Sequence, residues 1–287
     1  MSKKNLNHSS LNILGGYGYV GSVYHEMYGG IRNEKYDYVP KSNNVLYFIS
    51  TISNHTFLDN PHRDINTNLT TLVSVLEELK TQDIPTFNFI SSGFVYGEHD
   101  DIVTENTVCN PKGFYSATKR CAEQLVEFYC KTHGINYRII RLCNVIGGLD
   151  KKTSPKKNAV HFMVNQVLEG KRPTLFLDNK DDKTIREYMD VSDICRAVET
   201  ILDKGNVNEI FNVSSSDPIS QQEILEYAHQ KKFNTAFEYD VTPPSDFEKS
   251  IYIPSIRMSN DKINQLGFVA EKGVRDIIDS LVENYND

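Results

Sequence analysis

A tyrosine and a lysine in the segment Tyr115-Ser-Ala-Thr-Lys119 have the spacing of a proton-transfer pair. On a helix, residues four apart lie on the same face, so the phenol and the ammonium would be neighbours. Lowering the pKa of a tyrosine from ~10 to near neutrality needs about 4 kcal/mol, and one charge at ~4 Å with an effective dielectric constant of ~20 supplies about that much. Lys119 would then make Tyr115 a general base. A chain this rich in both residues contains about one such pair by chance. The position of the pair must therefore decide whether it has a chemical role.

The position of this pair supports a chemical role. Residues 86–91 (T-F-N-F-I-S) are typical of a strand and residues 113–133 of a long helix, so the pair opens the helix that follows a strand. Ser92, at the carboxyl end of that strand, would hydrogen-bond a substrate oxygen while Tyr115 moves the proton. The alternative for Ser92 is a turn serine that caps the loop. The three residues predict a Ser-Tyr-Lys oxidoreduction site.

A glycine-rich turn near the start of the chain predicts a dinucleotide site. Gly15, Gly18 and Gly21 follow the short apolar run at residues 11–14 and precede a helix predicted over residues 20–28. Without Cβ atoms the turn can be tight, its N–H groups can approach a pyrophosphate, and the helix N-terminus adds partial positive charge. The alternative is a glycine turn without a ligand, but the strand before it and the helix after it favour binding.

The region after this helix departs from the usual dinucleotide-binding pattern. An acidic residue about twenty positions beyond the glycines normally holds the adenosine ribose, but here the chain runs almost directly into a strand predicted over residues 44–51. A strand and a helix are therefore expected to be missing. We expect weak cofactor binding and poor discrimination between NAD and NADP. The residues that could contact the ribose or a 2′-phosphate are Asp37, Arg32, Lys35 and Lys41.

The order of predicted elements indicates an α/β fold with a doubly wound, Rossmann-like parallel sheet. Strands alternate with helices, including a helix at residues 63–80 and a strand at residues 135–142, and such alternation requires crossover connections. We expect a dinucleotide-binding domain at residues 1–150 and a smaller C-terminal substrate-binding lobe at residues 151–287. Residues ~190–215 would return to the main domain.

Composition excludes several other classes of protein. The net charge of −7 argues against a general nucleic-acid binder, because phosphate neutralisation needs clustered lysines and arginines. The five cysteines are scattered without a Cys-x-x-Cys pair, which predicts no disulfide framework, no zinc or other metal site, and a reducing cytoplasm. No apolar signal core and no run of about eighteen apolar residues occurs, so no membrane role is expected.

Five segments, taken in order, resemble one known family. They are G-G-Y-G-Y-V-G, I-S-S-G-F-V-Y-G, F-Y-S-A-T-K, R-L-C-N-V-I-G and R-E-Y-M-D-V-S-D, and together they resemble the extended short-chain dehydrogenase/reductases, the NAD-dependent epimerase/dehydratase family of nucleotide-sugar enzymes. The resemblance implies NAD or NADP as cofactor and a nucleotide sugar as substrate. It implies Ser92, Tyr115 and Lys119 as the catalytic triad.

The resemblance also implies binding roles for individual residues. For the cofactor these are Gly15, Gly18, Tyr19, Val20, Gly21, Ser50, Asn68, Tyr115 and Lys119. For the substrate they are Ser92, Asn144, Asn158, Arg186 and Arg257, the last as a second phosphate contact. Planar guanidinium groups suit phosphate because their donors match two oxygens. The alternatives are a surface pair of Arg186 with Glu187 or Asp190, a turn role for Asn144, and a packed or surface role for His161.

Two departures from the family bear on the reaction. Gly93 and Phe94 stand where the 4,6-dehydratases have an Asp-Glu pair, so the acid and base for water elimination are absent, and Glu187 replaces a frequent Asp. The resemblance therefore implies a 4-epimerase with transient hydride transfer to NAD(P). The alternatives are an NAD(P)H-dependent 4-keto reductase acting on a nucleotide-linked deoxysugar and a non-catalytic, cofactor-sensing relative.

The resemblance further implies a homodimer. The helices near residues 68–80 and 113–133 would pack against their twofold mates. Val73, Leu76 and Phe128 are the candidate contacts, although each of them could instead face its own sheet.

Overall fold

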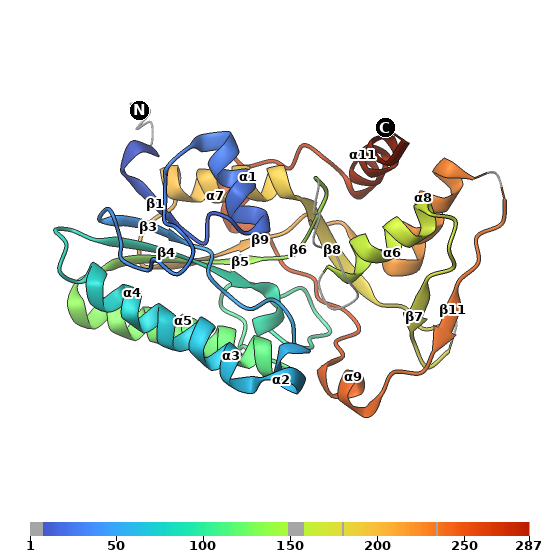
Figure 1. Ribbon diagram of the computed structural model, residues 1–287, viewed down its shortest axis with the longest axis horizontal. Coiled ribbons are helices and arrows are strands. Elements are labelled where there is room, and N and C mark those ends of the chain that lie inside the picture. The colour runs from blue at the N-terminus through green and yellow to red at the C-terminus, as the bar shows by residue number, and fades with distance from the viewer. Residues whose placement is uncertain (1–7, 149–157, 180, 234, 287) are drawn as a thin grey trace.

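The computed structural model describes residues 8–148, 158–179, 181–233 and 235–286 (Figure 1). The expected boundary near residue 150 lies outside the described residues. The larger part of the molecule is built on a six-stranded sheet with the order β2-β1-β3-β4-β5-β9, in which every neighbouring pair is parallel. This confirms the predicted α/β, Rossmann-like fold. The strands are β1 (Leu11–Leu14), β2 (Ile31–Arg32), β3 (Asn44–Tyr47), β4 (Thr86–Ser92), β5 (Asn136–Leu142) and β9 (Glu209–Val213).

Helices cover both faces of this sheet (Figure 1). On one face lie α1 (Tyr19–Tyr28) and α7 (Val191–Lys204), where Tyr24 and Val198 are buried in the same core. On the other face lie α4 (Thr71–Leu79) and α5 (Phe114–His133), which bury Leu72 and Val126 against β3 and β4. In α4 the buried residues recur at three- and four-residue spacing, which forms one apolar stripe: Leu72, Val75, Leu76 and Leu79.

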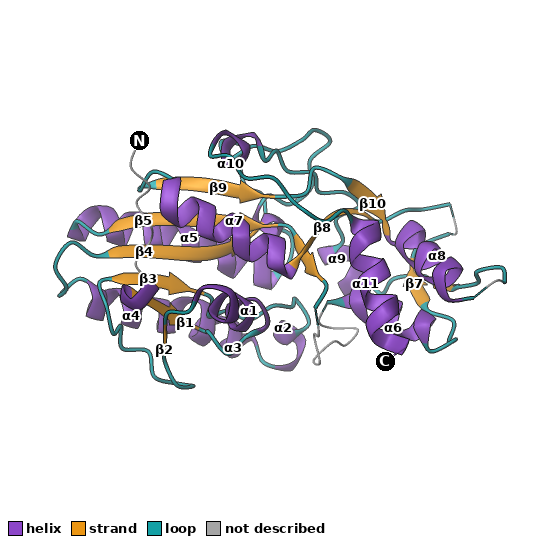
Figure 2. Ribbon diagram, turned by 90° about the horizontal axis from the view of Figure 1, so that it is seen from above, coloured by secondary structure: helices purple, strands orange, loops and turns teal. Residues whose placement is uncertain are grey.

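The shortened region differs from the prediction in one respect. Ile31 and Arg32 form β2 at the edge of the sheet, paired with Asn12 and Ile13 of β1, so a second strand is present where none was expected. A strand of two residues is too short to show the alternation of apolar and polar residues by which strands are predicted. No helix occurs between Gly29 and Asn43. Because β2 runs parallel to β1, its carboxyl end lies beside the glycine turn that follows β1 (Figure 2).

The helix predicted over residues 63–80 is interrupted. It consists of α3 (Pro61–Ile65), a π-helical turn (Asn66–Thr70) and α4. The π-helical turn includes Asn68, whose side chain is buried and turned toward the loop after β3. Such turns add a residue to the helical repeat and are frequent at functional sites.

The second, smaller part of the molecule lies beyond the carboxyl ends of the main strands (Figure 2). It contains a sheet with the order β10-β8-β6 and a parallel pair, β7 and β11, packed with α6, α8 and α11. Its strands are β6 (Asn144–Ile146), β7 (Thr174–Phe176), β8 (Ile185–Asp190), β10 (Pro218–Ser220) and β11 (Asp240–Thr242). Its helices are α6 (Ala159–Leu168), α8 (Gln221–Lys232) and α11 (Val274–Asn286). The short helices elsewhere are η1 (His8–Ser10), α2 (Thr56–Asp59), η3 (Gly93–Val95), α9 (Asp246–Ile251) and α10 (Asp261–Gln265).

Within the described part of the chain, no helix is both long enough and apolar enough to cross a membrane.

Candidate active site

The glycine turn forms a close-fitting cradle at the N-terminus of α1. Gly15 has a positive φ of 84° and its carbonyl accepts the N–H of Gly18 at 2.9 Å. A Cβ on Gly21 would lie 2.7 Å from the carbonyl oxygen of Gly15, so only glycine fits there. Gly18 caps α1 without any side-chain hydrogen bond. The N–H groups of the first turn therefore have no side-chain cap and remain available to an anion such as a pyrophosphate.

A cavity of about 800 Å³ extends from this turn to the carboxyl end of β4. Ligand cavities typically hold roughly 300–1,000 Å³, so this one accommodates a large ligand. Most of the predicted site residues line it: Gly15, Gly18, Tyr19, Val20, Gly21, Ser50, Ser92, Tyr115, Lys119, Asn144, Asn158 and Arg186. Tyr19 also donates its hydroxyl to the carbonyl of Gly147, on the loop after β6. The structure thus joins the glycine turn and the Ser-Tyr-Lys residues in one space.

Tyr115 is held by a residue that the sequence analysis missed. Gly113, at the N-terminus of α5, provides no side-chain cap, but Asn54 Oδ1 accepts the backbone N–H of Tyr115 at 2.9 Å. A Cβ on Gly113, where φ is 88°, would overlap the amide of Asn54. Asn54 lies in the loop after β3, and its place beyond the carboxyl end of a parallel strand is the signal that could have identified it.

Ser92 caps a turn and also lines the cavity. Its Oγ accepts the backbone N–H of Phe94 at 3.3 Å and so caps η3. Its hydroxyl also faces the cavity and, with that of Ser50, acts to lower the pKa of Tyr115. Burial outweighs both hydroxyls and raises the pKa of Tyr115 to about 12. The expected lowering of this pKa is therefore not produced by the protein residues alone, because desolvation disfavours the phenolate.

Lys119 is buried beside the same strand. Its ammonium donates to the carbonyl of Ile90 at 2.7 Å and lies 4.4 Å from the ring centroid of Phe89. Burial lowers the pKa of Lys119 to about 7, although the carboxylate of Glu123 acts in the opposite direction. A lysine that is readily deprotonated near neutrality can exchange a proton with the site, which an exposed lysine cannot do at this pH.

Asn68 does not line the cavity but anchors a buried polar network behind it. Its Oδ1 accepts the N–H of Thr51 at 2.9 Å and the hydroxyl of Ser50 at 3.2 Å, and its Nδ2 donates to Thr51 and to Thr118 of α5. Thr51 donates its hydroxyl to Asp64, whose second carboxyl oxygen has no hydrogen-bond partner. Burial raises the pKa of Asp64, and its charge raises the pKa of Tyr115. No local pattern in the sequence singles out Asp64.

The opposite wall of the cavity comes from the smaller lobe. Asn144 donates to the carbonyl of Glu187 at 3.2 Å, and Asn158, in a left-handed conformation with φ 46°, donates to the carbonyl of Val145 at 3.1 Å. Arg186 is buried and donates to the carbonyls of residues 185, 253 and 254, so it forms neither of the surface pairs considered above. Its guanidinium lies against the ring of Phe94 at 5.8 Å.

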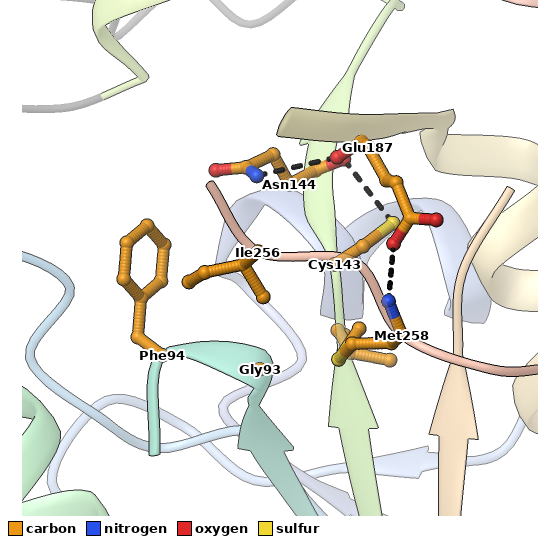
Figure 3. Close-up of a pocket in the computed structure, with 8 residues that line it drawn as sticks. Gly93, Phe94, Cys143, Asn144, Glu187, Ile256 and Met258 are labelled. Atoms are coloured by element: carbon orange, nitrogen blue, oxygen red, sulfur yellow. Dashed lines mark hydrogen bonds between the residues drawn. The ribbon is translucent and has the colours of Figure 1, made fainter. Parts of the chain in front are cut away.

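Glu187 closes a small pocket next to this wall. Its Oε2 accepts the hydroxyl of Ser214 at 2.6 Å and the backbone N–H of Met258 at 2.8 Å. Figure 3 shows this carboxylate turned toward Met258, with Cys143 and Asn144 beside it. Burial raises the pKa of Glu187. The carboxylate that replaces the family's frequent aspartate therefore joins β8 to the segment at residues 256–258.

Arg257 is not brought to the cavity. The chain here forms a bridge between Met258 and Val103, and the guanidinium of Arg257 donates to the carbonyl of Asp100. The expectation of a second phosphate contact at Arg257 is not supported, because the backbone pairing directs this side chain to another loop. His161 is buried within α6, as one of the alternatives for it proposed.

The described residues contain no group of three or more His, Cys, Asp or Glu side chains that could hold a metal ion.

Comparisons with known proteins identify the family of this chain. Residues 37–214 match the NAD-dependent epimerase/dehydratase family. A low-salt glycan biosynthesis protein of Haloferax volcanii is 32% identical over 163 residues, 56% of this chain and 50% of that protein. A putative UDP-glucose 4-epimerase of Methanocaldococcus jannaschii is 26% identical over 249 residues, 84% of this chain and 77% of that protein. The chain thus spans only part of the length of these relatives.

The fold itself is shared with solved structures. The UDP-glucose 4-epimerase of Thermotoga maritima in complex with UDP-glucose has a TM-score of 0.82 at 20% identity, covering 96% of this chain and 98% of that one. The predicted resemblance, the predicted enzyme class and the predicted nicotinamide dinucleotide cofactor are confirmed at the level of the family. This chain belongs to the NAD-dependent epimerase/dehydratase family.

Proposed function

We propose that this protein is a nucleotide-sugar 4-epimerase that uses NAD or NADP. The observation that supports this most directly is the convergence of Ser92, Tyr115 and Lys119 with the glycine turn around one cavity. The relatives named as UDP-glucose 4-epimerases support the same reaction. The absence of an Asp-Glu pair after Ser92, where Gly93 and Phe94 stand, disfavours dehydration.

The residues of the cavity divide the work between two ligands. The glycine turn would hold the cofactor pyrophosphate, and Asn144, Asn158 and Arg186 form a polar wall for the nucleotide sugar. A nicotinamide bound there would supply reversible hydride transfer at the sugar carbon. Ser92 would donate a hydrogen bond to the sugar oxygen while Tyr115 exchanges its proton.

Turnover with defined nucleotide sugars tests this proposal. Purified protein is incubated with UDP-, GDP-, CDP- or dTDP-sugars and a catalytic amount of NAD or NADP, and the sugars are separated by chromatography. We expect interconversion of two sugars that differ at one carbon, without net change in cofactor absorbance at 340 nm. Tyr115→Phe serves as the inactive control.

The same experiment separates the alternatives. Stoichiometric consumption of NADPH or NADH with a 4-keto sugar would identify a reductase. Cofactor binding with no conversion of any sugar would favour a cofactor-sensing protein. Either result would contradict the epimerase proposal.

We also propose a homodimer formed through α4 and α5. Phe128 is 71% exposed on α5 and is available for such a contact, and Val73 is half-buried. Leu76 is fully buried in the chain's own core, so it is not a contact. Sedimentation velocity is expected to show a dimer, and Phe128→Asp should give a monomer. A native monomer at micromolar concentration would contradict the proposal.

We further propose a cytoplasmic location. All five cysteines are free thiols, two of them buried, at Cys130 and Cys195. Reducing compartments maintain unpaired thiols. Fractionation of producing cells with thiol labelling tests this proposal, and recovery in an oxidising compartment would contradict it.

A further inference from the structure

The four residues considered for the adenosine ribose occupy distinct positions in the structure. Asp37 and Lys41 form an ion pair with each other at 3.1 Å, and Asp37 also accepts the N–H of Val39. The exposed Lys35 places its ammonium 4.8 Å from the ring centroid of its neighbour Tyr36. Of the four, Arg32 is the one whose contacts lie on the glycine turn.

Arg32 packs directly on that turn. It is the last residue of β2, and it pairs in register with Ile13, two positions before Gly15. A Cβ on Gly16 would lie 2.7 Å from Cγ of Arg32, so the stem of the arginine crosses the turn where only a glycine leaves room. The guanidinium lies 4.4 Å from the ring centroid of Tyr17, which lines the cavity.

The charge of Arg32 is available to a ligand. Among the described residues no carboxylate forms an ion pair with it, and its single hydrogen bond is a long one, at 3.5 Å, to the carbonyl of Gly16. The nearest acid along the chain, Glu34, accepts the hydroxyl of Tyr17 at 3.3 Å. The other polar residue at this strand end, Asn33, is buried and bonds to Asn12 and to the loop backbone.

We infer that Arg32, stacked on Tyr17 beside the glycine turn, binds the 2′-phosphate of the cofactor and makes this chain select NADP over NAD. A residue at the end of the second strand contacts the adenosine ribose in this type of fold, where a carboxylate favours NAD and an arginine accommodates the added phosphate. The planar guanidinium donates to two phosphate oxygens.

This inference replaces the expectation of poor discrimination that followed from the shortened region. It rests on the proposed function only in requiring a nicotinamide dinucleotide. The short segment between Gly29 and Asn44 contains no helix, but Arg32 still stands at the end of its strand. A phosphate bound by a guanidinium stacked on an aromatic ring is held without a longer loop.

Fragments of the cofactor test the inference without any sugar chemistry. Calorimetric titrations of the native protein with 2′,5′-ADP and with 5′-AMP differ only in the 2′-phosphate. We expect 2′,5′-ADP to bind about ten- to a hundredfold more tightly, as a charge-assisted contact predicts. The affinity for NADPH should exceed the affinity for NADH by a similar factor. Added salt should reduce the ratio of these two affinities.

One substitution and one matched control assign the effect. Arg32→Met keeps an unbranched stem that can pack on Gly16 and removes the charge. It should therefore weaken the binding of 2′,5′-ADP by about tenfold or more and leave the affinity for 5′-AMP unchanged. Lys35→Met removes a neighbouring cation and should change the affinity for neither ligand.

Three outcomes would overturn the inference. They are equal binding of the two fragments by native protein, equal weakening of both by Arg32→Met, and a loss with Lys35→Met that matches the loss with Arg32→Met. Selective 2′,5′-ADP binding in a protein that converts no nucleotide sugar would uphold this inference while the proposed function fails.

Discussion

Asn54 Oδ1 accepts the backbone N–H of Tyr115 at 2.9 Å, so the loop after β3 fixes the first turn of the helix that carries the phenol. Asn54→Ala removes this acceptor and should lower the free energy of unfolding by about 1 kcal/mol, as loss of a helix cap does. Because the phenol loses its fixed position, kcat should fall about tenfold or more while cofactor affinity changes little. Urea unfolding and steady-state kinetics measure both effects.

Asn54→Asp is the control for this cap. It keeps an acceptor at the helix N-terminus and should retain the stability that Asn54→Ala loses. Full activity in Asn54→Ala would show that the contact does not position Tyr115.

Tyr115→Phe should remove nearly all turnover. The ring keeps its packing and only the oxygen that exchanges the proton is lost, so kcat should fall about a thousandfold or more with cofactor affinity largely unchanged. Single-turnover kinetics and calorimetric titration of the cofactor provide the two readouts. A kcat near the native value would remove Tyr115 from the mechanism.

Lys119 should give the protein a specific dependence of stability on pH. Burial lowers the pKa of Lys119 to about 7 in the folded protein, whereas an unfolded lysine titrates near ~10.4. Between these values the unfolded chain binds more protons, so the free energy of unfolding rises with pH. From pH 7 to pH 9 the native protein should gain about 2 kcal/mol relative to Lys119→Met.

This comparison uses the difference between two proteins because burial also raises the pKa of the Cys130 and Cys195 thiols, and their exposure on unfolding adds its own pH dependence to the stability. Chemical unfolding at several pH values measures it. Identical pH dependence in the two proteins would mean that Lys119 keeps an ordinary pKa.

Asp64, which is hydrogen-bonded to Thr51 and through it to Asn68, should influence the pKa of Tyr115. The charge of Asp64 raises the pKa of Tyr115, so Asp64→Asn should move the ascending limb of the kcat/KM profile to lower pH. Asp83→Asn, which changes an exposed carboxylate, should leave the limb in place. A lower kcat with an unmoved limb would assign Asp64 a structural role only.

Local patterns in the sequence were sufficient to predict which residues would lie together around the cavity. Tyr115 and Lys119 share a helix face through spacing alone, and Gly15, Gly18 and Gly21 make a tight turn because a backbone without Cβ atoms permits it. Alternating strands and helices then determine a parallel sheet, whose strand ends place Ser92 beside these elements. Each of these inferences depends on residues close together in the chain.

The tertiary structure alone decided the contacts between distant segments. Asn54 reaches Tyr115 across 61 positions, and Arg257 is directed to the loop of Asp100 rather than to the cavity. Arg32 lies on the glycine turn because the two-residue strand β2 pairs with β1, a register too short to leave a sequence pattern. Such contacts depend on how the whole chain crosses the sheet, and residue types with local spacing do not determine that path.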